Sequence, residues 1–342
     1  MNITVLAGGW SPERNVSLTS GTLIANALIR KGHRVLLLDA YIGAPEHEKA
    51  DASELFRDRE YEVPGILEMV PDLDELKRSQ GNPRSYLGSR VLELCEAADL
   101  VYLGLHGGMG ENGQIQAVLD SYGIRYTGSG YVGSLLAMHK GLTKQMFKMN
   151  GVPTPEGQCL TAENWERMTP KDIRYPCVVK PASCGSSVGV SMIDTPEELE
   201  AAVREAFRWC DEIIIEDRIV GRELTMAVLS GDVLPPVEII PKTGFYDYKN
   251  KYQSGQTEEI CPAEVSASVL KDMREVSLKA FRVLHLKDYA RFDYILDGQD
   301  RLWCLEANTL PGMTPTSLLP RMAQSKGIAY DDLCDMIVRM SL

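Results

Sequence analysis

The sequence predicts an α/β protein, α+β in parts, with three domains in a chain of 342 residues. One observation is a strand–helix–strand unit at the N-terminus, which is typical of a parallel sheet. Another is a pair of short apolar strands near the C-terminus, separated by a polar turn, which is typical of a hairpin. A third is a lysine-bearing strand in the middle of the chain that leads into a loop of small residues. A chain of this length can bury several cores.

Composition argues against several classes of function. The chain has 36 Lys and Arg against 48 Asp and Glu, a net charge of −12, so nucleic acid and anionic membranes are not expected as main partners. No apolar run approaches the roughly 20 residues that span a membrane, and the first residues lack the basic start of a signal peptide. The eight cysteines are scattered without metal-binding spacing and are expected to be core residues of a cytoplasmic protein.

The N-terminal unit contains a candidate ligand loop. Residues 2–7 form an apolar strand, a helix follows to about Lys31, and residues 34–39 form a second strand. The loop at residues 8–15 has two glycines but lacks the third glycine of a dinucleotide fingerprint. A carboxylate at Glu13 would repel a pyrophosphate, so this position suits an ammonium group better.

The N-terminal domain is expected to cover residues 1–133, with an irregular acidic insertion at about 43–98 that contains one helix near 85–97. A third strand at 99–105 ends at His106, and a glycine-rich loop and a helix follow. Open α/β sheets bind ligands at the carboxyl ends of their strands, so His106 is a candidate site residue. A buried structural histidine is the alternative.

Residues 128–133 match GxGxxG, but we expect this match to be a decoy. No strand that ends in Asp or Glu follows the next helix at the distance a dinucleotide site requires. The helix after the match contains Lys140 and Lys144 and is expected to stop at Asn150-Gly151, before two prolines.

The central domain is expected to cover residues 134–222. Its strand at 175–181 carries Lys180 to a loop whose glycines and hydroxyls allow backbone N–H groups to surround a phosphate chain. The loop is not a P-loop, because GxxxxGK[ST] does not occur in the chain. Glu216 and Glu223 flank a turn farther on and could bind an adenine amino group and a ribose, or could be surface charges.

The C-terminal domain, residues 223–342, begins with a candidate lid. The loop at 241–256 is dense in aromatic residues and lysines, which is a plausible cover for anionic ligands. Farther on, the loop at 309–318 is neither a strand nor an ordinary turn, and it enters a helix. These features indicate that the C-terminal domain carries functional loops.

Two strands of the same domain carry a candidate metal and anion site. Arg291 and Asp293 share one side of the first strand, and Glu306 and Asn308 share one side of the second. If the strands pair with these sides matched, their oxygen atoms suit Mg²⁺ and the guanidinium suits a phosphate or an oxyanion. A solvated hairpin with a surface ion pair is the alternative.

Taken together and in order, these motifs closely resemble the D-alanine–D-alanine ligases of the ATP-grasp superfamily. The resemblance covers nearly the whole chain outside roughly 43–98. The departures are that insertion, His139 in place of the usual acidic residue, and Ser183-Cys184 in the phosphate loop. The motifs that carry it are Ser11-Pro12-Glu13-Arg14, His106-Gly107, Lys180-Pro181, Gly185-Ser186-Ser187-Val188-Gly189, Phe245-Tyr246-Asp247-Tyr248, Lys251-Tyr252, Arg291-x-Asp293, Glu306-x-Asn308 and Pro311-Gly312-Met313-Thr314.

The resemblance implies an ATP-grasp fold with ATP bound between the central and C-terminal domains. It implies an ADP-forming ligase that joins two D-alanines through an acyl phosphate, for peptidoglycan precursors, in a cytoplasmic homodimer. A ligase of another pair, such as D-alanine with D-serine, or another carboxylate–amine ligase is the alternative. The two expected Mg²⁺ ions, for which Mn²⁺ could substitute, would lie on Asp293, Glu306 and Asn308.

The resemblance also implies roles for the remaining candidates. ATP is expected to contact Lys140, Lys180, Gly185, Ser187, Glu216 and Glu223. The two amino acids are expected to contact His106, Lys251, Ser317 and Leu318. The expected catalytic residues are Glu13, Ser186 and Tyr252, as a hydrogen-bonded triad, and Arg291 with the Gly312 N–H, as oxyanion donors.

Overall fold

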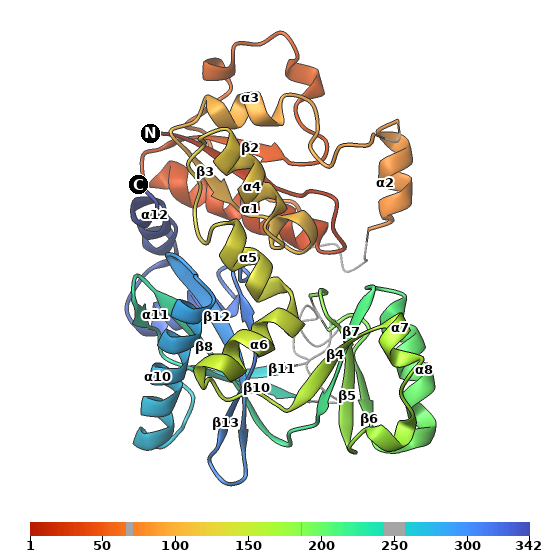
Figure 1. The fold of residues 1–342 in the computed structure, drawn as a ribbon. Helices are drawn as coiled ribbons and strands as arrows, with labels where there is room; N and C mark the ends of the chain where they lie inside the picture. The colour runs from red at the N-terminus through yellow and green to blue at the C-terminus, as the bar shows by residue number, and fades with distance from the viewer. Residues whose placement is uncertain (66–70, 82, 186, 243–256) are drawn as a thin grey trace.

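The computed structural model describes residues 1–65, 71–81, 83–185, 187–242 and 257–342. The predicted lid beyond residue 242, with Lys251 and Tyr252, lies outside the described residues, and so does Ser186. Three sheets organise the described chain: Figure 1 shows the N-terminal sheet at the top, the C-terminal sheet at the lower left and the central sheet at the lower right. This arrangement agrees with the mixed α/β fold that the sequence predicts.

The N-terminal sheet is parallel, as the strand–helix–strand pattern predicts. Its order is β2-β1-β3, and the central strand β1 is buried along its whole length after its first residue. Parallel strands need helical crossovers, and α1 supplies the first of them. The strands are β1 (Asn2–Ala7), β2 (Arg34–Asp39) and β3 (Leu100–Leu103), and the first helix is α1 (Arg14–Arg30).

The insertion contains more helix than the sequence analysis expected. Only α3 falls within the predicted helix near 85–97, and α2 is an additional helix. Asp72 begins α2, because its side chain accepts a hydrogen bond from the Glu75 N–H. The helices of this region are η1 (Pro45–His47), η2 (Ala52–Glu54), α2 (Leu73–Ser79) and α3 (Val91–Glu96).

The single helix expected around Lys140 and Lys144 is two helices. His139 adopts an extended backbone conformation, and its ring accepts a hydrogen bond from the Leu142 N–H, so it ends one helix and caps the next. The second helix ends at Gly151 in the left-handed conformation, as predicted. The helices that lead here are η3 (Gly108–Gly110), α4 (Gln114–Ser121), α5 (Tyr131–Met138) and α6 (Lys140–Asn150).

The central sheet is antiparallel, in the order β4-β7-β5-β6, and α8 packs on it. The capping box of Thr195 and Glu198 begins α8. The strands are β4 (Gly157–Thr161), β5 (Cys177–Pro181), β6 (Ser191–Ile193) and β7 (Glu212–Asp217). The helices are α7 (Ala162–Trp165), η4 (Pro170–Asp172) and α8 (Pro196–Phe207).

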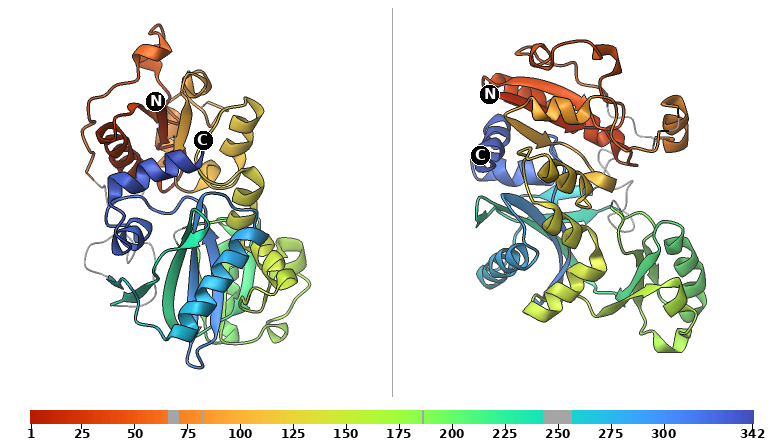
Figure 2. Two further views of the ribbon diagram at one scale, coloured as in Figure 1. Left: turned by 90° about the vertical axis from the view of Figure 1, so that its left-hand side faces the viewer. Right: turned by 45° about the horizontal axis from the view of Figure 1, so that its top comes forward.

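The C-terminal sheet is antiparallel, in the order β11-β10-β8-β12-β13, with β9 paired to β8. Helix α10 packs on β8 and β13, and Figure 2 shows it alongside this sheet. The strands are β8 (Gly221–Leu229), β9 (Asp232–Val233), β10 (Val237–Pro241), β11 (Thr257–Ile260), β12 (Tyr289–Asp297) and β13 (Leu302–Asn308). The helices are α10 (Ala267–Val283), α11 (Leu318–Ser325) and α12 (Tyr330–Met340).

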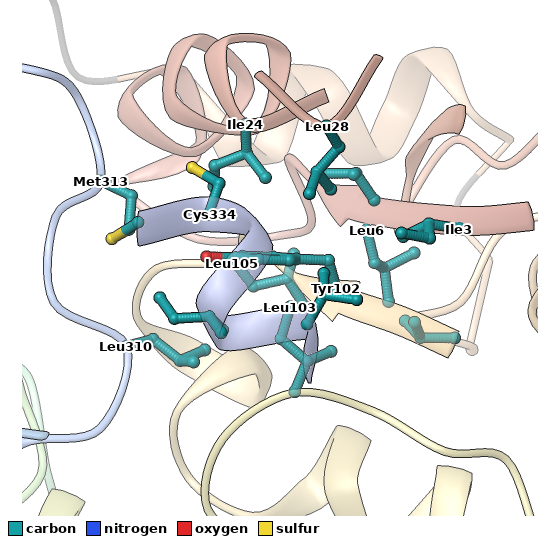
Figure 3. Packing of buried hydrophobic residues seen from close by; sticks show 14 of the residues in the cluster. Ile3, Leu6, Ile24, Leu28, Tyr102, Leu103, Leu105, Leu310, Met313 and Cys334 are labelled. Carbon is teal, nitrogen blue, oxygen red and sulfur yellow. The ribbon is translucent and has the colours of Figure 1, made fainter. Parts of the chain in front are cut away.

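The end of the chain returns to its beginning. Helix α12 packs on α1, and one apolar core contains Ile24, Cys334 and Tyr102 together with Leu310 from the loop before α11 (Figure 3). Ion pairs also cross this contact, including Arg30 with Asp331 at 2.8 Å. The N-terminal sheet and the functional loop after β13 therefore share a core, which holds that loop against the N-terminal domain.

Candidate active site

The hairpin of β12 and β13 has the register that the sequence predicts. Arg291 pairs with Asn308 and Asp293 pairs with Glu306, so all four residues lie at one end of the hairpin. The paired positions of antiparallel strands place side chains on the same face. The predicted meeting of two carboxylates, an amide and a guanidinium is confirmed.

Asp293 is the centre of this group. It accepts two hydrogen bonds from Arg291, at 2.9 and 2.8 Å, one from Asn308 Nδ2 at 3.0 Å and one from Thr225 Oγ1 at 2.7 Å. Glu306 lies 3.2 Å from the ammonium of Lys140. Four hydrogen bonds to a buried carboxylate indicate an organised site rather than a solvated ion pair.

The donor set fits a hard cation. Asp293 and Glu306 supply carboxylate oxygens and Asn308 an amide oxygen, the ligand types that Mg²⁺ prefers when phosphates complete its shell. No group of three or more His, Cys, Asp or Glu side chains that could hold a metal ion occurs in the part of the chain that the structure describes. A cation here would therefore need ligands from elsewhere, such as a polyphosphate.

Three lysines and one glutamate lie between the central sheet and α6. Glu216 contacts Lys180 and Lys144, each at 2.5 Å, and the Lys140 ammonium donates to Cys184 O at 2.7 Å. Burial lowers the pKa of Lys140, but Glu306 outweighs this effect, so its pKa is raised. Burial raises the pKa of Glu216, but its two lysines outweigh that effect and lower it. Burial lowers the pKa of Lys144, and Glu216 offsets this effect only in part.

A cleft of about 970 Å³ opens between the central and C-terminal sheets. Apolar side chains such as Val178 and Leu305 form part of its wall, which suits the faces of an aromatic base. The predicted site residues that line it are Lys140, Lys180, Ser187, Glu216, Glu223, Asp293 and Glu306. The predicted nucleotide residues thus share one cleft, except Gly185, which lines the neighbouring pocket. We call this the nucleotide cleft.

A second cavity, of about 1110 Å³, adjoins the first, and Glu306 lines both. All three parts of the chain contribute to it, since its walls come from the loop after β1, the phosphate loop and the loop after β13. The predicted residues that line it are Glu13, His106, Gly185, Arg291, Glu306, Asn308, Gly312, Ser317 and Leu318. We call it the amino-acid pocket.

His106 is buried, and both of its ring nitrogens have partners. Nε2 lies 3.0 Å from Ser20 Oγ, and Nδ1 lies 3.1 Å from the Leu310 carbonyl oxygen. Burial lowers the pKa of His106, so its ring is neutral near pH 7. His106 therefore lines the pocket and also ties the loop after β13 to the N-terminal domain.

Glu111 is a site residue that the sequence analysis missed. Its carboxylate lines the amino-acid pocket, accepts a hydrogen bond from the Gly107 N–H at 2.7 Å and is hydrogen-bonded by the Leu310 backbone. Burial, together with the charge of Glu13, raises the pKa of Glu111 to about 8. Its position in the same glycine-rich loop as His106 was the available signal.

Glycines make room for the polar groups of this pocket. A Cβ on Gly107, whose φ is +65°, would lie 2.5 Å from Glu13 Oε2, and one on Gly312 would lie 2.9 Å from Ser317 Oγ. Ser317 Oγ accepts a hydrogen bond from the Thr314 N–H, and Ser317 is the residue before α11. Side chains at these glycines would displace the groups that line the pocket.

The GxGxxG match at 128–133 lies at the start of α5 and lines neither cavity. The Gly128 N–H donates to Asp288 at 3.2 Å, and Gly133 packs against the backbone of His285. These glycines serve packing between the N-terminal and C-terminal parts of the chain.

Comparisons with known proteins agree with this geometry. The family models described as D-ala D-ala ligase N-terminus and C-terminus match residues 2–129 and 146–339. The D-alanine–D-alanine ligase of Pediococcus pentosaceus is 40% identical, over 99% of this chain and 97% of its own, and that of Lacticaseibacillus casei is 38% identical, over 100% and 96%. The crystal structure of D-alanine–D-alanine ligase from Bacillus anthracis complexed with ATP has a TM-score of 0.75, 29% identity, and coverage of 100% and 96%.

Proposed function

The chain belongs to the D-alanine–D-alanine ligase family, and from this premise we propose how its two adjoining cavities divide the reaction. The activity is the ATP-dependent, ADP-forming joining of two D-alanines for peptidoglycan precursors. The observation that carries our assignment of steps is the hairpin end at Arg291, Asp293, Glu306 and Asn308, which stands where the nucleotide cleft meets the amino-acid pocket.

ATP occupies the nucleotide cleft in this proposal. Its phosphates contact the ammonium groups of Lys140 and Lys180. They also contact Gly185 and Ser187 of the phosphate loop, whose backbone N–H groups suit an anion. Glu216 and Glu223 contact the adenine and the ribose in the same cleft. The apolar part of the cleft wall, with Val178 and Leu305, receives the faces of the base.

Asp293, Glu306 and Asn308 hold up to two Mg²⁺ ions, or Mn²⁺, in the same proposal. When bound, such ions screen the negative charges of the phosphates. The carboxylates that hold them already carry positive partners, since Arg291 donates to Asp293 and Lys140 lies beside Glu306. Those partners are then available to the phosphates and to the reacting carbonyl.

The first D-alanine binds with its ammonium group near Glu13, and its carboxylate attacks the γ-phosphate to form an acyl phosphate and ADP. The amine of the second D-alanine then attacks the acyl carbon, and phosphate leaves. Arg291 and the Gly312 N–H stabilise the tetrahedral oxyanion between these steps, as preorganised donors do. Both groups line the amino-acid pocket, close to the shared Glu306.

The second D-alanine binds with its carboxylate at Ser317 and the Leu318 N–H, where the start of α11 favours an anion. Lys251 assists there, and Glu13, Ser186 and Tyr252 form a triad that ties the lid to the N-terminal domain; the last two lie outside the described residues, as does Lys251. His106 completes the wall of this subsite.

Incubation of the protein with ATP, Mg²⁺ and single or paired D- and L-amino acids tests the proposal. We expect phosphate release with D-alanine alone, and mass spectrometry should identify D-alanyl-D-alanine as the product. A second product with D-serine would instead support a ligase of a mixed pair. Phosphate release with L-amino acids only would overturn the proposal.

We also propose a division into domains at 1–133, 134–222 and 223–342, with the insertion at about 43–98, and a cytoplasmic homodimer. Support for the division is that each sheet lies largely within one part. Support for the cytoplasm is that all eight cysteines are free and that ATP is a substrate. No described helix is long and apolar enough to cross a membrane. Light scattering after size exclusion tests the dimer.

A further inference from the structure

Lys144 is a buried cation that the steps above do not use. It follows Lys140 by one turn of α6, and it is 5% exposed and absent from the lining of the nucleotide cleft. Its ammonium lies 2.5 Å from Glu216 Oε2 and donates to Thr154 Oγ1 and to the Pro155 carbonyl oxygen, each at 3.0 Å. A buried ammonium persists only when it is paired and hydrogen-bonded, and these partners satisfy it.

Glu216 is shared between two lysines that differ in their access to ligands. Lys180 lies 2.5 Å from Glu216 Oε1 and lines the nucleotide cleft. Lys144 lies 2.5 Å from Glu216 Oε2 and does not line the cleft. Two ammonium groups and one carboxylate leave one positive charge in excess. Of the two lysines, Lys180 is the one that lines the cleft, where a polyphosphate would compete with Glu216 for it.

The competition would leave Glu216 in need of a counter-ion. Glu216 is 4% exposed, and a carboxylate buried without a partner is strongly unfavourable. Lys144 does not line the cleft, and hydrogen bonds to Thr154 and to the Pro155 carbonyl oxygen hold its ammonium in place. Lys144 is therefore the cation that remains beside Glu216.

We propose that Lys144 is a positioning residue for nucleotide binding, which keeps Glu216 charged and in place when the phosphates of ATP draw Lys180 away. The release of Lys180 frees Glu216 Oε1 as an acceptor for the exocyclic amino group of adenine. The inference rests on the proposed nucleotide roles of Lys180 and Glu216. It predicts that Lys144 acts on ATP affinity and on preference for an amino-bearing base, and not on the amino-acid pocket.

The same helix offers a matched control. Lys148 follows Lys144 by four residues and pairs with Glu156 at 2.6 Å, but both of these side chains are exposed at the surface. Exposed ion pairs contribute little to stability or function. A methionine at either position keeps most of the length of the lysine side chain and removes the charge.

The experiment compares Lys144→Met, Lys148→Met and the wild type by calorimetric titration with ATP and Mg²⁺ in the absence of D-alanine. We expect the Kd for ATP to rise at least tenfold in Lys144→Met and to stay within twofold in Lys148→Met. The KM for D-alanine at saturating ATP should stay within twofold in both. The ratio of Kd values for GTP and ATP should fall in Lys144→Met.

Two further variants keep the test decisive. In Lys144→Met combined with Glu216→Gln, no buried carboxylate remains to be balanced, so the additional loss relative to Glu216→Gln alone should vanish. If Lys144→Met does not fold, Thr154→Val removes one tether and should raise the Kd for ATP severalfold. An unchanged Kd in a folded variant overturns the inference, whereas a wild type that binds no ATP overturns the proposed function itself.

Discussion

Glu216 in the nucleotide cleft is buried and Glu111 in the amino-acid pocket is half-buried, and the pKa values of the two carboxyls shift in opposite directions. Burial raises the pKa of Glu216, but Lys180 and Lys144 outweigh it, and the net pKa is lowered. Burial and the neighbouring charge of Glu13 raise the pKa of Glu111 to about 8. The comparison teaches that the sign of the neighbouring charges, and not burial alone, sets the direction in which the pKa of each carboxyl shifts.

The two cavities differ in where their cations lie. Two lysines contact the single carboxylate of Glu216, although the described lining of the nucleotide cleft has five carboxylates and three basic side chains. In the amino-acid pocket, four glutamates line the wall with Arg291 as the single arginine or lysine among its described lining residues. That excess of carboxylates suits the ammonium groups of two amino acids and divalent cations.

The largest expected effect is on stability and concerns the nucleotide cleft. Glu216→Gln leaves Lys144 and Lys180 buried without their counter-ion, so we expect the free energy of unfolding to fall by about 3–5 kcal/mol. Urea unfolding of the ligand-free protein measures it. Glu156→Gln, which removes an exposed partner of Lys148, should cost less than about 1 kcal/mol. Equal losses in the two variants would mean that burial makes no difference here.

The next effect is on catalysis and concerns Arg291 in the amino-acid pocket. Arg291→Ala removes an oxyanion donor, so we expect kcat to fall by about 10² or more. Arg301 provides the control, because it forms an exposed Arg–Asp pair at the other end of the same hairpin, with Asp297 at 2.8 Å. Arg301→Ala should turn over normally in steady-state phosphate release. Near-normal turnover of Arg291→Ala would remove this residue from the mechanism.

The third prediction concerns Glu111, whose replacement should stabilise the protein, whereas replacement of Glu216 should destabilise it. The unfolded Glu111 carboxyl loses its proton near its usual pKa of 4.5, whereas the folded one keeps it to about pH 8. The folded state binds more protons in that window, so this group weakens stability as the pH rises through it. Glu111→Gln should therefore be more stable than the wild type at pH 8 by more than about 2 kcal/mol, with the difference shrinking toward pH 5.

Thermal unfolding of the ligand-free proteins from pH 5 to pH 8 measures this difference. Glu96 is exposed, and Glu96→Gln should show no such dependence on pH. If Glu111→Gln were less stable than the wild type at every pH, this would contradict the raised pKa of Glu111 in the folded protein.

The smallest effect concerns the shape of the amino-acid pocket. Gly107→Ala places a Cβ 2.5 Å from Glu13 Oε2, so we expect the KM for D-alanine to rise about tenfold, which corresponds to about 1.4 kcal/mol. The Kd for ATP should not change. Gly123 has nearly the same φ, +67°, and a Cβ there would meet no atom within 4 Å, so Gly123→Ala has the backbone strain without the clash. A matching KM change in both variants would assign the effect to strain.

The alternation of side chains along a strand was sufficient to predict the hairpin end. The four residues at this end meet as expected, because side chains two residues apart on a strand lie on the same face. They are Arg291 and Asp293 on β12 and Glu306 and Asn308 on β13. The helix around Lys140 was predicted as continuous, since nothing in the local pattern signalled that the His139 ring would cap a second helix. Glu111 was missed because its partners, Gly107 and Leu310, come together only when the loop after β13 docks on the N-terminal domain.

The amino-acid sequence by itself determined the family, the strand–helix–strand unit at the N-terminus, and which residues of the C-terminal hairpin share a strand face. The strand and helix patterns depend on neighbours within a few residues, and the family follows from the order of the motifs along the chain. Only the tertiary structure decided which carboxylates meet which cations: Lys144 and Lys180 reach the same Glu216 from α6 and β5, whereas Glu111 is buried near the like charge of Glu13. The physical reason is that the energy of a buried charge depends on distances in space and on exclusion of water, which are properties of the folded chain.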